Sequence, residues 1–331
     1  MTLQKIKLQN FRSYAKREFD LDKVTMVVGE NGSGKSNLME AIYLLATGKS
    51  FRADRENEMI QYGEQFSILN FQFLINSQLE NFQITITERK KFEINGVPRR
   101  MVDFVGRFRA VLFSPQDLEL ITGSPSGRRR YLDFVISQGD REYRRCLISY
   151  EKGLRQRNKL LEMIREGLAD RSQLFFWDRL LIKNGNYLTQ KREEYLQQLD
   201  VQGETLYAAE YDKSVISETR LKQYEQEEVA AAATLVGPHR DDFVVNLGGR
   251  DVSKFGSRGE QRMAVLWLKK GEIKCLGENP TLLLDDIFSE LDHKHREEVQ
   301  KMVKNYVGQV ITTTVDRHLL PENGEDRIIE L

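Results

Sequence analysis

One eight-residue stretch constrains the fold of this chain more than any other feature. Residues 29–36 read Gly-Glu-Asn-Gly-Ser-Gly-Lys-Ser and follow the short apolar run Val24–Val28. The pattern G-x-x-x-x-G-K-[ST] after a strand is typical of a phosphate-binding loop. Its glycines let the backbone turn tightly and present N–H groups to phosphate oxygens, and a helix predicted over residues 37–46 adds the partial positive charge of its N-terminus. The stretch therefore predicts a nucleoside triphosphate site rather than an ordinary glycine turn.

The side chains of this loop have distinct expected roles. Lys35 is expected to meet the β- and γ-phosphates, and the hydroxyl of Ser36 is expected to coordinate Mg²⁺. The residues expected to contact the nucleotide here are Gly29, Glu30, Asn31, Gly32, Ser33, Gly34, Lys35, Ser36 and Asn37. A nucleoside triphosphate with Mg²⁺ is thus the expected ligand.

A later strand that ends in two acids supplies the other half of the expected site. Residues 281–284 are apolar and run into Asp285 and Asp286. In proteins with a phosphate loop the first acid holds Mg²⁺, and the second orients or deprotonates the attacking water. A buried strand that merely ends in a polar turn looks similar, but the complete loop upstream favours the catalytic interpretation. We therefore expect Asp285 as a metal ligand, and Asp286 with Lys35 as catalytic residues.

The segment Ser257-Arg258-Gly259-Glu260-Gln261 precedes a helix predicted over residues 263–276. Serine and glycine at a helix start can present a hydroxyl and N–H groups to an anion, although an ordinary N-cap has the same composition. The order of phosphate loop, S-x-G-x-Q helix and acidic strand resembles that of ABC-type ATPases. On this resemblance Ser257, Gly259 and Gln261 are candidate nucleotide contacts.

Composition limits the classes of protein to which the chain can belong. Its 331 residues hold 50 basic and 50 acidic side chains, so any contact with DNA must come from a local patch. Cys146 and Cys275 lack metal-ligand spacing, which indicates reduced thiols in a cytosolic protein. No apolar run approaches the roughly 20 residues needed to span a bilayer, and residues 1–10 alternate like a strand rather than an export signal. We expect a soluble, cytoplasmic protein of two compact units.

The sequence pattern changes twice along the chain, from strand-like to helical and back to strand-like. Up to Ser114 short apolar runs alternate with turn signals, including the hairpin signal Asn95-Gly96. Residues 126–237 contain no proline and carry leucines and aromatics at helical spacing. A strand-like pattern then follows, and it predicts a hairpin over residues 243–252. The residues expected to break the helical stretch into short pieces are Gly139, Gly153, Gly167, Gly185 and Gly203.

The simplest organisation is one α/β domain with a helical insertion. We expect an α/β P-loop NTPase of ABC-ATPase head type. The ATPase domain is expected to comprise residues 1–118 and 234–331, and the helical lobe residues 119–233.

Short motifs also resemble the chromosome-maintenance branch of ABC ATPases, which includes Rad50 and the SMC proteins. Residues 8–14, Leu-Gln-Asn-Phe-Arg-Ser-Tyr, are similar to the opening of that branch, where an arginine at the place of Arg12 helps to hold the nucleotide. Residues 289–292 resemble the D-loop that crosses its dimer interface.

Longer segments resemble the RecF family of bacterial recombination mediators: residues 47–52, 115–125, 128–133 and 237–242. Two positions invite comment. Gln116 stands where that family usually has an acid, and is a candidate metal and nucleotide contact as in the Q-loop of ABC proteins. As in RecF, Thr314 stands where many ABC ATPases have a switch histidine, which makes it a candidate catalytic residue and suggests slow hydrolysis.

The resemblance implies a mechanism. ATP would join two copies head to tail, with Ser257 and Gly259 reaching the γ-phosphate held by the partner copy, and hydrolysis would time the release of the clamp. It implies a weak ATPase that binds double-stranded and gapped DNA at the nucleoid and helps to load recombinase. RecR and RecO are the partner proteins implied, and no membrane partner is.

The most basic segment of the chain is a candidate DNA contact. Residues 126–165 hold 11 Arg or Lys against five acids, and arginines directed at phosphates give affinity without sequence preference. The alternative is a solvated helical face or arginines paired with nearby acids. For His239 and Arg240 we favour a structural or nucleotide-relayed role over catalysis. The candidate DNA-binding residues are Arg128, Arg129, Arg130, Arg141, Arg144 and Arg145.

Three other functions are weaker interpretations. A transporter's ATPase subunit does not explain residues 10–14 or the helical insertion. A Rad50-like end-tethering protein needs a longer insertion and a Cys-x-x-Cys hook. A small-molecule kinase does not explain the S-x-G-x-Q helix or the second acid.

Overall fold

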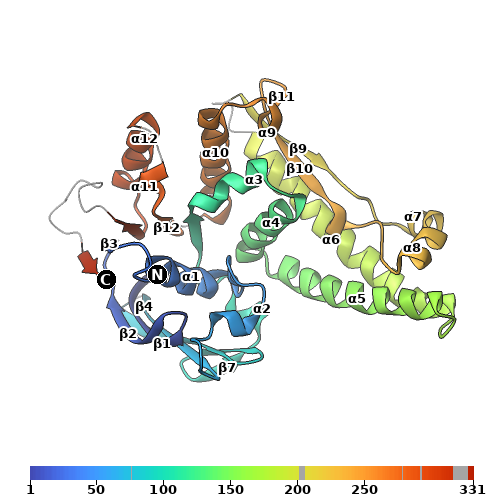
Figure 1. Ribbon diagram of the computed structural model, residues 1–331, viewed down its shortest axis with the longest axis horizontal. Helices are drawn as coiled ribbons and strands as arrows, with labels where there is room; N and C mark the ends of the chain where they lie inside the picture. Colours follow the sequence, from blue (N-terminus) through green and yellow to red (C-terminus); the bar gives the residue numbers. More distant parts are fainter. Residues whose placement is uncertain (76, 201–205, 278, 291–292, 316–326) are drawn as a thin grey trace. The chain divides into compact units, whose positions relative to one another are not determined.

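The chain forms two compact units (Figure 1). The computed structural model describes all residues except 76, 201–205, 278, 291–292 and 316–326. One unit comprises Met1–Asp117 with Glu272–Leu331, and the other comprises Leu118–Gly271. Residues 234–271, which we expect to belong to the ATPase domain, cluster with the second unit, and the expected domain division stays a prediction. Among the described residues, no helix combines the length and apolar character that a bilayer-spanning segment requires.

A five-stranded parallel sheet lies at the centre of the first unit. Its strand order is β14-β3-β13-β12-β8. The strands β12 and β13 are buried along their whole length, as expected for the middle of a parallel sheet. Because the carboxyl ends of parallel strands share one edge, the loops after β3, β8, β12 and β13 meet there. The bounds are β3 (Val24–Val28), β8 (Ala110–Phe113), β12 (Thr281–Asp285), β13 (Val310–Thr314) and β14 (Arg327–Glu330).

The helix α1 (Lys35–Thr47) packs against this sheet and is buried along most of its length. It begins at Gly34, whose φ of 109° is a left-handed conformation that favours glycine. A side chain at Gly34 would also meet the hydroxyl of Tyr14. The helices α11 (Ile287–Glu290) and α12 (His293–Lys304) follow β12.

A six-stranded antiparallel sheet completes the first unit, with the order β2-β1-β4-β5-β6-β7. The predicted Asn95-Gly96 hairpin is confirmed, since both residues have positive φ between β6 and β7. Phe73, Phe82 and Phe104 form aromatic contacts in the core of this unit. The bounds are β1 (Thr2–Phe11), β2 (Tyr14–Asp20), η1 (Glu56–Met59), β4 (Ser67–Ile75), β5 (Gln78–Ile86), β6 (Lys90–Ile94), β7 (Val97–Arg99), α2 (Met101–Phe104) and η2 (Pro115–Leu118).

The second unit is mainly helical and carries a three-stranded antiparallel sheet of order β11-β10-β9. The long helices α5 and α6 lie side by side (Figure 1). The predicted hairpin is confirmed as β10 and β11. The bounds are α3 (Glu119–Thr122), α4 (Pro125–Gly139), α5 (Arg141–Arg165), η3 (Arg171–Leu174), α6 (Phe175–Asp200), β9 (Tyr207–Asp212), α7 (Glu218–Gln223), α8 (Glu225–Ala231), η4 (Pro238–Arg240), β10 (Asp242–Leu247), β11 (Arg250–Asp251), α9 (Val252–Phe255) and α10 (Arg258–Leu276).

Two expectations for this unit were wrong. Gly153 and Gly185 do not break helices but lie inside α5 and α6, at points of close approach. A Cβ at Gly153 would lie 2.6 Å from the side chain of Leu180, and one at Gly185 would lie 2.9 Å from that of Ile216. The predicted helical stretch also contains a strand, β9, whose alternating burial fits its pairing with β10. Gly203 lies outside the described residues.

Candidate nucleotide site

The predicted phosphate loop occupies residues 29–34, between β3 and α1. Gly32 and Gly34 have φ of 87° and 109°, so the loop uses backbone conformations that glycine adopts without strain. The ammonium of Lys35 donates hydrogen bonds to the carbonyls of Gly29, at 2.6 Å, and Glu30, at 2.9 Å. These contacts hold the lysine against the loop whose N–H groups are expected to bind phosphate.

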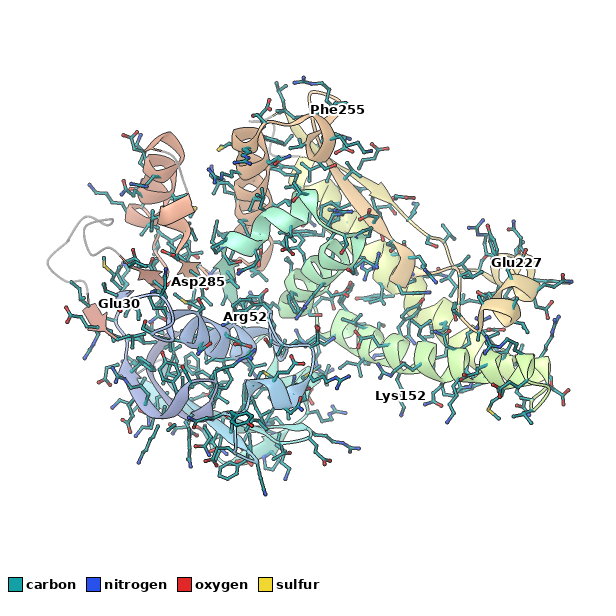
Figure 2. The ribbon with its side chains drawn as sticks, in the orientation of Figure 1. Glu30, Arg52, Lys152, Glu227, Phe255 and Asp285 are labelled. Atoms are coloured by element: carbon teal, nitrogen blue, oxygen red, sulfur yellow. The ribbon has the colours of Figure 1, made fainter. Side chains whose placement is uncertain are left out.

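The remaining side chains of the loop differ in exposure. Glu30, which Figure 2 labels together with Asp285, and Asn31 are exposed, as is Gly32. The hydroxyl of Ser33 is buried and has no hydrogen-bond partner among the described residues. Its backbone N–H donates to the carbonyl of Glu30 at 3.2 Å, which closes the turn.

Asp285 and Ser36 meet at the sheet edge, as the sequence predicts for a metal site. The Ser36 hydroxyl donates to Asp285 Oδ1 at 3.2 Å, although the two residues are 249 positions apart. Burial raises the pKa of the Asp285 carboxyl. Among the described residues no three His, Cys, Asp or Glu side chains gather as a metal-binding group. One carboxylate and one hydroxyl fit Mg²⁺, since that ion takes one or two protein ligands and completes its shell with phosphate and water.

The structure adds Thr313 to this set, a residue that no sequence motif indicates. Its hydroxyl donates to Asp285 Oδ1 at 2.7 Å and accepts from the N–H of Asp286 at 3.0 Å. Thr314, the candidate catalytic residue, is buried, and its carbonyl accepts from the N–H of Gly29 at 3.2 Å. The strand β13 therefore links the acidic strand end to the phosphate loop through both threonines.

Asp286 follows β12 with a φ of 51°, a left-handed conformation uncommon outside glycine. Its N–H bonds to Thr313 hold that turn. The geometry places its carboxyl immediately after the metal-site acid, and its catalytic role stays a prediction. The side chains of residues 289–292, the expected D-loop, lie outside what the structure describes.

Arg12 lies in a network around a buried acid on α1. Its guanidinium donates to both carboxylate oxygens of Glu40, at 2.7 and 2.9 Å, and to the carbonyl of Glu58 at 2.6 Å. Glu40 is fully buried and also accepts from the Ser50 hydroxyl at 2.5 Å. Arg52 lies 3.9 Å from the same carboxylate. The arginine expected to hold nucleotide is thus fixed by protein groups beside α1.

Asn37 and Tyr14 complete the surroundings of the loop. Asn37 donates to the Ser13 hydroxyl at 2.9 Å and accepts from Arg52 at 3.0 Å. The Tyr14 hydroxyl is buried without a hydrogen-bond partner among the described residues, and burial raises the pKa of Tyr14 to about 12. Because it faces Gly34, Tyr14 is a second residue beside the phosphate loop whose hydroxyl the sequence did not single out.

Gln116 is exposed in η2, just after β8. The structure gives it no hydrogen bond to Ser36 or Asp285 among the residues it describes. Its neighbour Asp117 accepts from the N–H of Ser114 at 2.6 Å and so shapes the turn. The metal-contacting role of Gln116 therefore stays a prediction.

The segment of Ser257 forms an exposed helix start in the second unit. The Ser257 N–H donates to the Glu260 carboxylate at 2.7 Å, and the Glu260 N–H donates to the Ser257 hydroxyl at 3.3 Å. This reciprocal pair is a capping box at the start of α10. Gln261 donates to the carbonyl of Val252 at 3.3 Å. The helix start, which includes Gly259, is thus held by these hydrogen bonds, and its contact with nucleotide stays a prediction.

The candidate DNA-binding arginines fall into two groups. Three of them hold protein groups inside the second unit. Arg128 binds the Asp242 carboxylate at 2.6 and 2.9 Å, Arg129 binds the carbonyl of Asp241 at 2.8 Å, and the buried Arg144 binds that of Ser137. These contacts fit the alternative interpretation, in which the arginines bind groups of the protein itself rather than DNA.

Two of the other three arginines are more accessible. Arg141 and Arg145 are exposed on α5, where Arg145 forms an ion pair with Glu142. Arg130 lies over the ring of Phe134. Arg141 and Arg145 therefore offer the most side-chain surface to a ligand, whereas Arg130 is half-buried, as are Arg128 and Arg129.

Residues 237–242 form part of a buried polar network. Arg192, with 3% of its side chain exposed, binds Asp133 at 2.8 Å and the fully buried Asp241 at 3.1 Å. It also donates to the carbonyl of Pro238 at 2.6 Å and the hydroxyl of Tyr143 at 3.0 Å. This network ties α4, α5 and α6 to the segment before β10.

His239 belongs to the same segment. Its Nε2 bonds the carbonyl of Thr234 at 2.9 Å, and its Nδ1 bonds the Tyr150 hydroxyl at 2.8 Å. A carbonyl only accepts, so Nε2 carries the proton and Nδ1 accepts from the tyrosine. Burial lowers the pKa of His239 to about 4. These bonds support the structural role favoured for this residue.

Together, β3 with its loop, β13 beside it and the acidic end of β12 define a P-loop ATPase of head-domain type. The RecF/RecN/SMC N terminal domain family matches residues 2–330. DNA replication and repair protein RecF of Moorella thermoacetica is 37% identical over 342 residues, which cover 97% of this chain and 92% of that protein. RecF of Herpetosiphon aurantiacus is 36% identical over 361 residues, covering 96% of this chain and 94% of that protein. The chain belongs to the RecF family.

Solved structures agree with this assignment. The recombination mediator protein RecF–ATP in the RecFOR pathway has a TM-score of 0.87 and 29% identity, over 97% of this chain and 94% of that one. An Smc head bound to the C-winged helix domain of ScpA, at 17% identity, has a TM-score of 0.51 and shares the fold alone. The predicted class, an α/β P-loop NTPase of ABC-ATPase head type, is confirmed.

Proposed function

We propose that this chain is an ATP-binding protein of DNA replication and recombinational repair. The observation that carries the proposal is the convergence of Lys35, Ser36 and Asp285 at one sheet edge. The ammonium lies on the phosphate loop, and the hydroxyl and carboxylate lie 3.2 Å apart. Relatives named for DNA replication and repair, and a solved RecF–ATP structure, support the identity of the nucleotide and the process.

The site is suited to slow hydrolysis of ATP used as a conformational switch. Ser36 and Asp285 are the groups that would hold Mg²⁺, which neutralises phosphate charge when it is bound. Asp286 then orients or deprotonates water, and Lys35 stabilises charge on the transferred phosphoryl group. Thr314 offers no titratable ring, which supports a slow reaction. Arg12, Asn37 and Gln116 complete the proposed nucleotide contacts.

The switch works through a head-to-tail dimer. Ser257 and Gly259 of one copy close the phosphate loop of the other, so each nucleotide lies between two protomers. The Ser257 hydroxyl lies at an exposed helix start and is held by a capping box. This supports the role, because a group that is already fixed in position loses little freedom on binding. Loss of the γ-phosphate removes these contacts and opens the dimer.

In the same proposal the dimer clamps double-stranded DNA and single-strand gaps at the nucleoid in the cytoplasm. Arg141 and Arg145 are its exposed arginines, and Arg130 beside them is half-buried. Assistance to recombinase loading together with RecO and RecR follows the family resemblance and the RecFOR pathway of the solved relative. An ATPase subunit of a transporter, or a Rad50-like end-tethering protein, is the alternative that the test must exclude.

The test is a measurement of molecular mass and DNA binding with ATP, with ADP and without nucleotide, at two salt concentrations. We expect dimers and duplex or gapped DNA binding with ATP only, and a steep loss of DNA affinity with salt. Lys35→Ala should abolish nucleotide binding. Ser257→Arg should bind ATP and stay monomeric, and Asp286→Asn should bind ATP and remain dimeric because turnover stops. Nucleotide-independent monomers indifferent to DNA would refute the proposal.

A further inference from the structure

The turn between β1 and β2 lies against the phosphate loop. Its Ser13 hydroxyl accepts a hydrogen bond from the side chain of Asn37, at 2.9 Å, near the start of α1. The next residue, Tyr14, faces the last glycine of the loop, since a Cβ built on Gly34 would lie 2.6 Å from the Tyr14 hydroxyl. This close approach and the φ of 109° both favour glycine at position 34. The loop backbone and the tyrosine hydroxyl are therefore direct neighbours.

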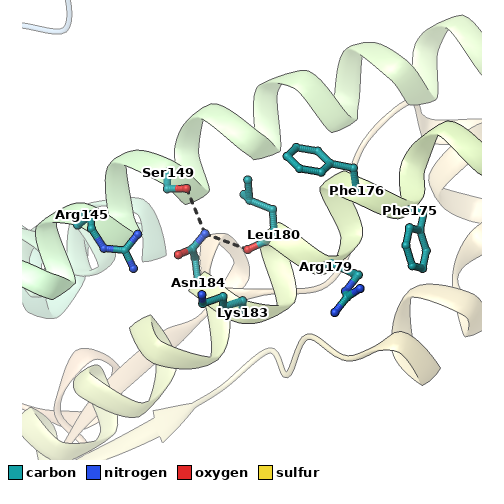
Figure 3. A pocket seen from close by; sticks show the side chains of 8 residues that line it. All are labelled: Arg145, Ser149, Phe175, Phe176, Arg179, Leu180, Lys183 and Asn184. Carbon is teal, nitrogen blue, oxygen red and sulfur yellow. Dashed lines mark hydrogen bonds between the residues drawn. The ribbon is translucent and has the colours of Figure 1, made fainter.

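The Tyr14 hydroxyl departs from the usual pattern of buried polar groups. Only 8% of the residue is exposed, and the hydroxyl has no hydrogen-bond partner in the part of the chain that the structure describes. By contrast, the buried side chain of Asn184 donates to Ser149 at 3.1 Å and to the carbonyl of Leu180 at 3.0 Å (Figure 3). A buried hydroxyl without a partner lowers stability, so such groups are rare in folded proteins.

The ring that carries this hydroxyl is held in place. It meets the ring of Phe19 edge to face, with centroids 5.5 Å apart. The strand β2 begins at Tyr14, which pairs with Phe11 at the end of β1. Burial raises the pKa of Tyr14 to about 12, so the phenol keeps its proton at neutral pH. Tyr14 therefore presents a fixed, uncharged donor beside the phosphate loop.

The acceptor that Tyr14 lacks is of the kind that a nucleotide carries. The carbonyl of Gly34 already accepts from the N–H groups of Asn37 and Leu38, at 2.8 and 3.1 Å, so both of its acceptor positions are in use. Phosphate oxygens carry negative charge and only accept hydrogen bonds. The N–H groups of a phosphate loop hold the α- and β-phosphates close to its glycines. A bound nucleotide thus brings acceptors to the end of the loop that Tyr14 faces.

We propose that the Tyr14 hydroxyl donates a hydrogen bond to an oxygen of the α- or β-phosphate of the bound nucleotide. Lys35, which follows Gly34, leaves the carbonyls of Gly29 and Glu30 to meet phosphate. The accompanying shift of the loop brings the phosphates within reach of the hydroxyl. An uncharged donor on a fixed ring adds affinity for a charged acceptor. The β1–β2 turn thereby becomes part of the phosphate site.

This inference rests on the proposed nucleotide site and extends it by a residue outside the phosphate-loop pattern. The competing explanation is a hydroxyl without any ligand. Such a group would lower stability and leave nucleotide affinity unaltered. The proposed contact makes the hydroxyl unfavourable without nucleotide and favourable with it, so the two explanations differ in what removal of one oxygen atom does to affinity.

The experiment compares wild type with Tyr14→Phe in the full-length protein, by calorimetric titration of ATP and ADP and by scanning calorimetry. The variant should bind both nucleotides about tenfold or more weakly, the usual loss for a hydrogen bond to a charged group, because both carry α- and β-phosphates. Without nucleotide, the transition that ADP shifts in wild type should move up by about 2–4 °C, since an unsatisfied buried hydroxyl is removed. The factor by which Mg²⁺ strengthens ADP binding should stay constant, because Ser36 and Asp285 are untouched.

The matched control is Tyr306→Phe in the same unit. The Tyr306 hydroxyl donates to the carbonyl of Pro280, which precedes β12 at the end of the strand away from Asp285. Because this hydroxyl already has an acceptor, its removal should lower the melting temperature and leave the affinity for both nucleotides unchanged.

Three results for Tyr14→Phe would overturn the proposal. One is unaltered affinity for both nucleotides. Another is a loss confined to ATP, which would place the effect at the γ-phosphate. The third is a lower melting temperature without nucleotide, which would mean that the hydroxyl has a partner before binding. Wild type that binds neither nucleotide would refute the nucleotide site itself, whereas tight wild-type binding with a neutral Tyr14→Phe would refute this inference alone.

Discussion

The strongest prediction from the structure concerns the contribution of Arg192 to stability, because its guanidinium donates hydrogen bonds to four partners in the interior of the second unit. Two of them are the carboxylates of Asp133 and Asp241, at 2.8 and 3.1 Å. Asp241 is fully buried and retains the N–H of Ser214, at 2.7 Å, and the hydroxyl of Tyr211 as donors. Removing the arginine therefore leaves a buried carboxylate with hydrogen bonds but without its counter-charge.

We expect Arg192→Met to lower the free energy of unfolding of this unit by about 3–5 kcal/mol, the usual cost of breaking one side of a buried ion pair. Methionine approximates the volume of the stem, so the loss reflects charge and hydrogen bonds more than packing. Arg192→Lys keeps the charge but offers a point donor in place of the planar fork. It should cost less than Arg192→Met and more than 1 kcal/mol.

Fluorescence provides a probe confined to the unit in question. The two tryptophans of the chain, Trp177 and Trp267, both lie within residues 118–271. Urea unfolding followed by tryptophan emission therefore reports this unit. A double variant, Arg192→Met/Asp241→Asn, neutralises the orphaned acid and should cost about 1–3 kcal/mol less than the sum of the single variants.

The reasoning fails if Arg192→Met changes the free energy of unfolding by less than about 1 kcal/mol. It also fails if the double variant is strictly additive, because additivity would mean that the arginine and Asp241 do not interact. A variant with unchanged stability that loses ATP hydrolysis would instead give residues 237–242 a direct role in turnover.

Three further outcomes follow from the contacts. Thr313→Val should weaken Mg²⁺-dependent ATP binding by about tenfold in titrations, since Asp285 loses a donor; a larger effect of Thr314→Val would favour the neighbouring hydroxyl. Mg²⁺-dependent ATP binding should weaken as pH falls through the raised pKa of Asp285. Without nucleotide, Asp285→Asn should raise the melting temperature of the protein at neutral pH. The variant removes a buried charge, and its amide oxygen still accepts the hydrogen bonds from Ser36 and Thr313. His239 has its pKa lowered to about 4, so stability is full above its unfolded pKa of about 6.5 and declines by up to about 3 kcal/mol as pH falls toward 4. His239→Gln should flatten that decline in acid titrations; an unchanged profile would exclude the histidine.

The nucleotide site was largely predictable because its chemistry is local. Glycines, lysine and hydroxyl must follow one another within one loop, so residues 29–36 are recognisable without knowledge of the fold. Two acids after an apolar strand are equally local. The spatial meeting of Ser36 and Asp285 then follows from a general property of parallel sheets, whose strand ends share an edge.

The sequence did not predict which threonine of β13 donates a hydrogen bond to Asp285, because that depends on strand register. Thr313 pairs with Asp285 across β13 and β12. In a strand, successive side chains point to opposite faces, so a shift by one residue would bring a different hydroxyl to the acid. Three consecutive threonines leave no sequence signal that distinguishes these registers. Glu40 did carry a signal, as the one acid within the apolar helix α1, but its partner Arg12 is known only from the fold.

Glycines within helices were misjudged for a related reason. Propensity alone predicts that Gly153 and Gly185 end helices, whereas both positions lie where a neighbouring side chain leaves no room for a Cβ. Contact across α5 and α6 therefore outweighs the local cost of glycine, about 1 kcal/mol relative to alanine. The basic segment shows the same limit, since the sequence counts charges but does not reveal that Arg128 is bound to Asp242. Its role in DNA binding stays a prediction.

The contacts of the phosphate loop imply that ATP binding is an exchange of partners. Lys35 donates to the carbonyls of Gly29 and Glu30, and Asp285 accepts from Ser36 and Thr313. Phosphate oxygens and Mg²⁺ must compete with these internal bonds for the same atoms. Net affinity is therefore the difference between two sets of charge-assisted contacts, each worth about 1.5–3 kcal/mol per bond. In the head-to-tail dimer proposed above, contacts from the second copy at the γ-phosphate would add to this difference and would couple ATP affinity to dimerisation.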